Sequence, residues 1–365
     1  MRMGERLFIP GPVTCAPDVL AATAAPLVDH RGPEFAALLG GIADGLRPVF
    51  GTSGDVVVLG SSGTGGLEAA VANSFAPGQK VLACPVGVFG RRFAQIACIY
   101  GLEVETLETP LGACVDSTAL AARLRDDRTH AFAGILLTHN ETSTGVQNDM
   151  AALAAAIGDH PATVIVDSVS GLGASAFAMD EWRFDIVVSA SQKALAAPPG
   201  LAMLALGERA WTRMTDDGAP RFYFDLRKAR QLGAVGQTPW TPPVSIAFGL
   251  AAALARYRAE GAERAYERHA RYARAIRAFA AAANLQLLSH PGAHSVTVVA
   301  LCEPPGIDVM AVRDRLRQRY GVVIGGGQAE LAGKIFRIGT MGALSPDDVA
   351  AALDAFETVL RDQGS

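Results

Sequence analysis

The sequence predicts an α/β fold: a mainly parallel sheet covered by helices, followed by a smaller C-terminal α+β domain. Between residues 52 and 206, short aliphatic runs alternate with helix-length, alanine-rich segments. This alternation is typical of strands that are buried on both faces of a parallel sheet. After Pro242-Pro243 the pattern changes to long helical segments and then to mixed short elements. The 365 residues, 50% of them hydrophobic, are enough for two domains.

The first half of the chain contains the expected buried strands. They are VVVLG (56–60), KVLAC (80–84), AGILLT (133–138), TVIVDS (163–168), DIVVSA (185–190) and LAMLAL (201–206). Helical segments separate most of these strands, so their connections favour parallel pairing.

The second half begins with a helix over 245–260, in which Ile246, Leu250 and Leu254 recur at helical spacing before Gly261. A second amphipathic helix follows. The remaining elements are a strand at 295–301, a helix near 308–319, strands at 320–327 and 334–339, and a terminal helix after Pro346. We therefore expect an N-terminal arm (1–14), a large domain (15–245) and a small domain (246–365).

The charge balance and the cysteine content exclude several classes of partner and binding site. Lys and Arg total 32 against 36 Asp and Glu, so a nucleic-acid partner is not expected. The sequence has no apolar stretch of ~20 residues and no signal-peptide pattern at its start, so no membrane association is expected. The five cysteines are scattered without a CxxC pair, which predicts no metal site and favours a cytoplasmic location.

A glycine-rich turn connects the first expected strand to a helix in GSSGTGGLEAAVANSF (60–75). Backbone N–H groups at such a turn, with a helix dipole behind them, suit a phosphate group. The turn matches neither a Walker A loop nor a dinucleotide fingerprint. An ordinary strand-to-helix connection is the alternative.

Two ionisable residues follow buried strands. Asp167 closes TVIVDS at the carboxyl edge of the sheet, where open α/β folds bind their ligands; a helix cap is the alternative. Lys193 lies in DIVVSASQKALAAPPG, and a partly desolvated lysine there can act as an imine-forming amine. A lysine bound to a nearby helix end is the alternative. Together, the turn, the carboxylate and the lysine meet the needs of pyridoxal phosphate.

At these residues the chain resembles the class V pyridoxal-phosphate aminotransferases, in the alanine–glyoxylate and serine–glyoxylate (serine–pyruvate) branch. The resemblance covers almost the whole chain in order. The matching stretches are FIPGPVTCAP (8–17), HRGPEF (30–35), SSGTGGLEAA (61–70), VGVFGRRF (86–93), THNETSTGV (138–146), VDSVSGLGA (166–174), SASQKALAAPPG (189–200), TPPVS (241–245) and KIFRIGTMG (334–342). It implies the fold type I architecture of pyridoxal-phosphate enzymes.

The resemblance also implies roles for individual residues. Lys193 would form the imine with the cofactor and Asp167 would pair with the pyridine nitrogen. The other cofactor-binding positions would be Ser62, Gly63 and Thr64 at the phosphate, Phe89 and Val169 against the ring, Thr142 near it, Gln192 beside the phosphate, and Thr241 reaching the site of the neighbouring subunit. The implied assembly is a homodimer with shared active sites.

Arg337, in KIFRIG, would be the bidentate clamp for the substrate carboxylate, with Gly11 and Pro12 closing the substrate side. From the residues alone, Arg337 could equally point to solvent from an edge strand. Gly171 and Thr238 depart from the usual pattern of the family, and both positions bear on the substrate pocket.

The implied reaction is transamination between a small amino acid of the alanine or serine type and a small 2-oxo acid, glyoxylate or pyruvate. The same scaffold leaves other reactions open: a transaminase with an unusual amine donor (ureidoglycine, pyridoxamine or an aminophosphonate) or a lyase. A non-catalytic module that binds the cofactor is the alternative from another class.

Overall fold

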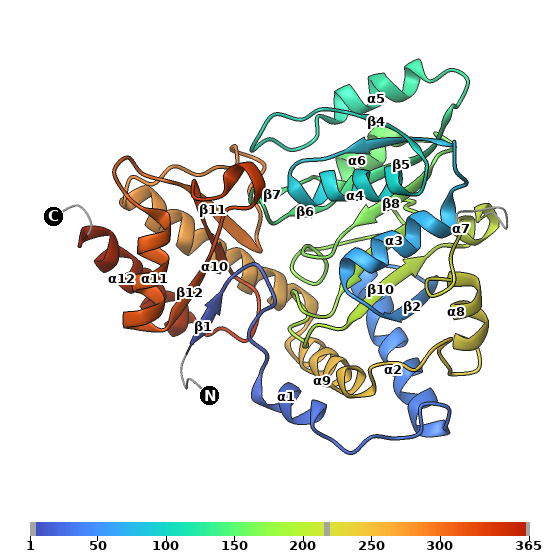
Figure 1. The fold of residues 1–365 in the computed structure, drawn as a ribbon, viewed down its shortest axis with the longest axis horizontal. Coiled ribbons are helices and arrows are strands. Elements are labelled where there is room, and N and C mark those ends of the chain that lie inside the picture. The colour runs from blue at the N-terminus through green and yellow to red at the C-terminus, as the bar shows by residue number, and fades with distance from the viewer. Residues whose placement is uncertain (1–4, 215–219, 363–365) are drawn as a thin grey trace.

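A computed structural model describes residues 5–214 and 220–362 of the chain (Figure 1). Its large sheet has seven strands. In spatial order they are β2 (Asp55–Gly60), β10 (Leu201–Leu206), β9 (Ile186–Ala190), β8 (Thr163–Asp167), β5 (Phe132–Thr138), β3 (Lys80–Cys84) and β4 (Glu103–Thr106). Parts of the three expected domains, namely residues 1–4, 215–219 and 363–365, lie outside the described residues.

The large sheet is mixed but dominated by parallel strands, which confirms the predicted fold class. β10 runs antiparallel to both β2 and β9, whereas the pairs from β9 across to β4 are parallel. The carboxyl ends of β3, β5, β8 and β9 therefore meet at one edge of the sheet. Ligands of open α/β folds bind outside this edge.

Successive residues of the central strands enter two different cores because side chains alternate across a sheet. In β5, Ile135 and Leu137 enter one core and Leu136 enters the other. The helices that pack into the first core are α1 (Pro17–Thr23), α2 (Pro33–Phe50), α5 (Ser117–Asp126), α6 (Met150–Ile157) and α9 (Val244–Glu260). Those of the second core are α3 (Gly63–Ser74), α4 (Val88–Ile99), α7 (Glu208–Arg213) and α8 (Leu226–Gly233).

A four-stranded sheet forms the second part of the molecule, on the left of Figure 1. Its order is β1 (Arg6–Phe8), β12 (Val322–Gly326), β13 (Ile335–Gly339) and β11 (Val298–Cys302). Three helices share its core: α10 (Ala262–Ala282), α11 (Val309–Tyr320) and α12 (Pro346–Arg361). A short hairpin, β6 (Asn140–Glu141) with β7 (Val146–Gln147), and a 3₁₀ turn, η1 (Ala329–Leu331), complete the elements.

Helix α9 packs with the large sheet. Its buried residues, among them Leu250 and Leu254, belong to the same core as α1 and α2, whereas Tyr272 and Ile276 of α10 lie in the core of the small sheet. Gly261 separates the two helices. We therefore propose Gly261 as the domain boundary, although the sequence pattern placed residues 246–260 in the small domain.

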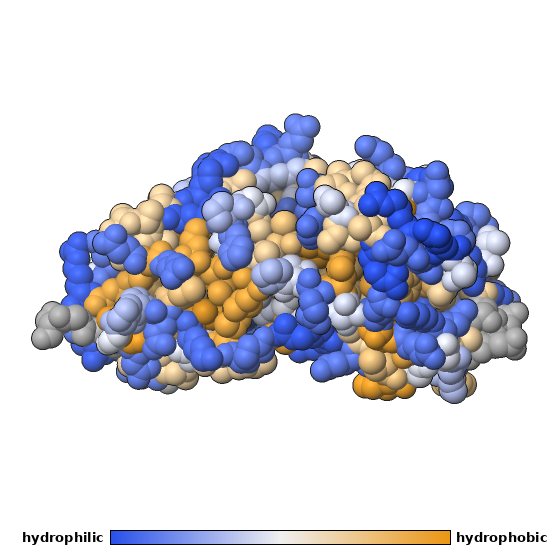
Figure 2. All heavy atoms as spheres, turned by 90° about the horizontal axis from the view of Figure 1, so that it is seen from above, coloured by the Kyte–Doolittle hydropathy of each residue, from blue (hydrophilic) through white to orange (hydrophobic). Residues whose placement is uncertain are grey.

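The surface mixes hydrophilic and hydrophobic residues. Figure 2 shows one face, on which hydrophilic side chains surround several hydrophobic patches. Among the residues of the structure, Leu27, Phe222 and Val235 are large apolar side chains that are strongly exposed. Within the described part of the chain, no helix combines the length and the apolar character needed to cross a membrane.

Candidate functional site

A cavity of about 230 Å³ opens at the carboxyl edge of the large sheet. Every residue that the sequence analysis assigned to the cofactor lines this cavity, except Thr241. These residues lie in the first turn of α3, the first turn of α4, the hairpin of β6 and β7, the end of β8 and the loop after β9. Residues far apart in the chain thus meet at one place, while their chemical roles remain predictions.

Lys193 lies three residues beyond the end of β9, and its amine is turned into the fold. Nζ donates a hydrogen bond of 2.6 Å to the carbonyl oxygen of Pro10. Burial lowers the pKa of this amine to about 8, partly offset by the nearby Asp167 carboxylate. Gly11 makes the close contact possible: its φ is +120°, and a Cβ at this position would lie 2.8 Å from Nζ.

Asp167 ends β8 and is almost completely buried. Its Oδ1 accepts a hydrogen bond of 2.9 Å from the N–H of Val169. Burial raises the pKa of the carboxyl group to about 7; the Val169 N–H and the Lys193 and Arg92 side chains oppose this rise. Asp167 lines the cavity, and a buried acid there is suited to a cationic partner.

Ser62 is the N-cap of α3, and its hydroxyl accepts a hydrogen bond from the N–H of Gly65. The first turn of this 12-residue helix contains Gly63 and Thr64 and faces the cavity. Free N–H groups and hydroxyls at a helix N-terminus suit a phosphate. Nearby, the buried Oε1 of Gln192 has no hydrogen-bond partner within the described ranges. A buried side-chain amide with an unpaired atom points to a ligand at this place.

Four further residues line the cavity that the sequence interpretation did not single out: Leu67, Arg92, Asn140 and Ser170. The sequence could have indicated Arg92, because it lies about one helical turn after Phe89 in α4 and therefore on the same side of that helix. Its guanidinium carbon lies 4.7 Å from the centre of the Phe89 ring. Asn140 and Ser170 hydrogen-bond to each other across 2.8 Å, a tertiary contact that the sequence does not reveal.

Arg337 lies in the middle of β13, buried, and does not point to solvent. Its Nε donates to the carbonyl oxygen of Gly326 at 2.6 Å, and its Nη1 donates to that of Thr142 at 3.0 Å. Arg337 therefore contacts the site through the backbone of Thr142. Pro12 and Thr241 are exposed and do not line the cavity.

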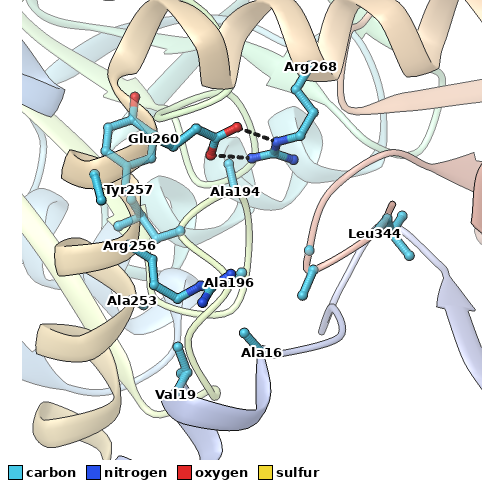
Figure 3. Close-up of a pocket in the computed structure, with 14 residues that line it drawn as sticks. Ala16, Val19, Ala194, Ala196, Ala253, Arg256, Tyr257, Glu260, Arg268 and Leu344 are labelled. Carbon is cyan, nitrogen blue, oxygen red and sulfur yellow. Dashed lines mark hydrogen bonds and ion pairs between the residues drawn. The ribbon is translucent and has the colours of Figure 1, made fainter. Parts of the chain in front are cut away.

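A larger cavity of about 520 Å³ lies behind the Lys193 loop, between α1, α9 and α10 (Figure 3). Its charged groups already have partners. Arg268 forms a two-point ion pair with Glu260, and Arg256 pairs with Asp18. The smaller cavity is the better candidate site because its ionisable groups face each other without such pairing. Over residues 5–214 and 220–362, no group of three or more His, Cys, Asp or Glu side chains could hold a metal ion.

We expect the Lys193 amine to react with a limiting acylating reagent at a rate that rises through pH 8. Its pKa is lowered from 10.5 to about 8, so the nucleophilic, unprotonated amine predominates above that pH. Mass spectrometry of labelled peptides from the cofactor-free protein measures the rate at each pH. Lys80 is the internal control, and a midpoint near 10.5 for Lys193 would contradict the expectation.

Comparison with known proteins places the chain in a family. The model of the class V aminotransferases matches residues 21–341. The chain is 37% identical to the L-aspartate–glyoxylate aminotransferase of Paracoccus denitrificans, covering 98% of this chain and 91% of that protein. It is 34% identical to the serine–glyoxylate aminotransferase of Methylorubrum extorquens, covering 99% and 92%.

A solved structure agrees with these relatives. The alanine–glyoxylate aminotransferase of Nostoc sp. superposes with a TM-score of 0.93 at 30% identity, covering 99% of this chain and 97% of that chain. The family model covers residues 21–341, and the Paracoccus denitrificans relative matches 98% of the chain. The chain therefore belongs to the class V aminotransferases, a family that depends in general on pyridoxal phosphate.

Proposed function

We propose that this protein binds pyridoxal phosphate and transfers the amino group of a small amino acid to a small 2-oxo acid, with glyoxylate as the favoured acceptor. The observation that carries the proposal is the juxtaposition, in one cavity, of a buried amine at Lys193, a buried carboxyl group at Asp167 and the N-terminus of α3. The names of the three similar proteins all include glyoxylate, whereas their amino donors differ.

The residues of the cavity fit this cofactor. The first turn of α3 would hold the phosphate, and the side-chain amide of Gln192 would donate a hydrogen bond to it. Phe89 and Val169 would bound the ring, Thr142 would lie near it, and Asp167 would face the pyridine nitrogen. When bound, pyridoxal phosphate supplies an electron sink that makes the Cα–H bond of the amino acid acidic.

Lys193 and Arg337 would act directly on the substrate. The Lys193 amine, with its lowered pKa, is unprotonated often enough near pH 8 to take the Cα proton as a general base. Arg337 keeps unused N–H groups after its two bonds to backbone carbonyls, and these would bind the substrate carboxylate. Gly11 and Pro12 would close the substrate side.

The test of the function is a half-reaction screen. Holoenzyme is mixed with alanine, serine, aspartate or another amine donor, and absorbance follows conversion of the cofactor to its pyridoxamine form. Conversion by one donor, followed by reversal with glyoxylate or pyruvate, supports transamination. Ureidoglycine, pyridoxamine and an aminophosphonate belong in the panel. Release of a product without conversion would indicate a lyase, and silence across the panel would favour a non-catalytic module.

Replacing Arg337 by alanine is expected to raise KM for carboxylate substrates by roughly tenfold to hundredfold, because a charge-assisted hydrogen-bond pair is lost. Steady-state kinetics with the best donor measures the effect. Arg319, which forms an ion pair with Asp362 at the surface, provides the control Arg319→Ala. An unchanged KM in Arg337→Ala would remove this residue from the substrate site.

We also propose a homodimer in which Thr241 reaches the site of the neighbouring subunit. The support is local: Thr241 is exposed, and it follows Trp240, whose ring stacks on the exposed Phe222 at 4.6 Å. Such an exposed aromatic cluster suits a protein interface. Sedimentation that finds only monomers would contradict the assembly. The cytoplasmic location remains a proposal that rests on the five free cysteines.

A further inference from the structure

Glu141 is a completely buried carboxylate that the proposed reaction does not use. It ends the short strand β6, next to Thr142, and lies beside the N-terminus of α4. Burying a carboxylate is costly unless hydrogen bonds compensate for the lost water. The hydrogen-bond partners of Glu141 therefore indicate the role of this buried carboxylate.

The two oxygens of Glu141 accept four hydrogen bonds. Oε2 accepts from the backbone N–H groups of Phe89 and Gly90, both at 3.0 Å. Oε1 accepts from the N–H of Ser143 at 3.0 Å and from its hydroxyl at 2.7 Å. The Ser143 oxygen in turn accepts from the N–H of Val88 at 2.9 Å. The first three N–H groups of α4 are thus bound by residues some 50 positions further along the chain.

This arrangement replaces the usual local cap of a helix. Gly87, the N-cap of α4, has no side chain to offer. A Cβ at Gly87 would lie 2.5 Å from Cγ of Glu141 and 2.4 Å from the Ser143 hydroxyl, so glycine makes room for the remote cap. Capping by a carboxylate also suits the positive end of the helix dipole.

The residues held in this way belong to the cavity. Phe89 lies in the first turn of α4 and forms part of the cavity wall. Thr142 directly follows Glu141, and its carbonyl oxygen accepts from Arg337 at 3.0 Å. One carboxylate therefore fixes the backbone on both sides of the site, at the ring-facing wall and at the arginine.

We propose that Glu141 is a positioning residue for cofactor binding: its carboxylate sets the place of the Phe89 ring and of the Thr142 backbone. This proposal rests on the proposed function, since Phe89 is assigned to the cofactor ring there. Glu141 touches neither cofactor nor substrate in this scheme and acts only through the residues that it holds.

The decisive variant is Glu141→Gln. An amide has the same shape as the carboxylate, but its NH₂ group is a donor and would face N–H groups on one side. At least one buried backbone N–H would then lose its acceptor in either orientation of the amide, so we expect pyridoxal phosphate to bind roughly tenfold to hundredfold more weakly. The induced circular dichroism of the bound cofactor is expected to change, because the ring beside it shifts.

The matched control is Asp127→Asn. Asp127 is also a buried carboxylate that accepts two backbone hydrogen bonds, from Ala131 and Phe132, but it does not line the cavity. Both variants are expected to lose thermal stability. Only Glu141→Gln is expected to alter cofactor affinity and circular dichroism. Equal effects of the two variants on affinity would show that Glu141 acts through stability alone and would overturn the proposal.

Hydrogen exchange of the cofactor-free protein tests the capping of α4 by Glu141 and Ser143 independently of the proposed function. In Glu141→Gln the amides of Val88, Phe89 and Gly90 are expected to exchange faster, while those of β8 keep their protection. Ser143→Ala, a milder change, is expected to release Val88 first. Unchanged exchange at these amides would overturn the inference. A wild-type protein that fails to bind pyridoxal phosphate would instead overturn the proposed function and leave the exchange result standing.

Discussion

Replacing Lys193 by alanine is expected to reduce turnover by at least about a thousandfold while the fold survives. The change removes both the amine that would hold the cofactor and the general base that would move the Cα proton, and a positioned base alone contributes about 10²–10⁴. The loss of an amine whose burial depresses its pKa also relieves the cost of burying its charge, so no loss of stability is expected.

Borohydride reduction followed by peptide mass spectrometry measures the covalent part of this prediction. The wild-type protein is expected to gain the mass of the cofactor on the peptide that contains Lys193, and Lys193→Ala is not. Lys80→Ala is the control, because Lys80 begins β3 at the opposite edge of the sheet and pairs with Glu105. A Lys193→Ala variant with near-normal turnover would end the assignment.

The substitution Asp167→Asn is expected to lower turnover on the order of a hundredfold, the scale of a lost electrostatic group. An amide cannot keep a pyridine nitrogen protonated, so the electron sink weakens. The same substitution is expected to stabilise the cofactor-free protein at pH 8 by about 4 kcal/mol, because ionising a carboxyl group whose pKa is raised from 3.8 to about 7 costs the fold that much. The Asn oxygen can still accept the hydrogen bond from Val169.

The pH dependence of this stability gain has a definite sign. The pKa of Asp167 is raised from 3.8 to about 7, so the folded state holds a proton that the unfolded state releases between these values. The wild-type protein therefore loses stability as the pH rises from about 4 to 7, and the gain of Asp167→Asn is complete above pH 7. Near pH 4 the two proteins are expected to be equally stable.

Urea denaturation of the cofactor-free proteins at pH 4.5 and pH 8 measures the difference. Asp185→Asn is the contrasting variant, since Asp185 is equally buried but paired with Arg209 and bonded to the N–H of Val164. That change is expected to destabilise the fold at pH 8, because the arginine and the amide lose a charged partner. If Asp167→Asn were less stable than the wild-type protein at pH 8, burial of the Asp167 carboxylate would not lower the free energy of unfolding, and the prediction would be wrong.

The sequence predicts the large sheet well because its strands are buried on both faces. Residues such as Ile165 and Val166 must both be apolar when each face of the sheet carries a core, and an uninterrupted aliphatic run results. Asp167 and Lys193 follow from the same logic, since a charged residue at the end of such a run lies at the sheet edge. The strand bounds agree with the predicted runs to within one residue at β2, β5, β8 and β9.

Other features escape prediction because their cause is tertiary. β1 has only three residues and exists through pairing with β12, more than 300 positions away; β4 depends in the same way on β3. The role of Glu141 as a remote cap of α4 is visible only when the two segments meet. In the sequence, THNETSTG could equally be a polar loop. Helix α9 shows the same limit. The spacing of its apolar residues predicts a helix, but it does not predict that the helix packs into the core of the large sheet.

The hydrogen bond from Lys193 to Pro10 has a practical consequence for handling the protein. Strand β1 ends at Phe8, so only one residue separates the small sheet from the carbonyl that anchors the amine. Mechanical load on the first strand would be transmitted almost directly to the Lys193 amine. An affinity tag, a surface tether or a fusion partner is therefore best attached beyond α12, at the other end of the polypeptide.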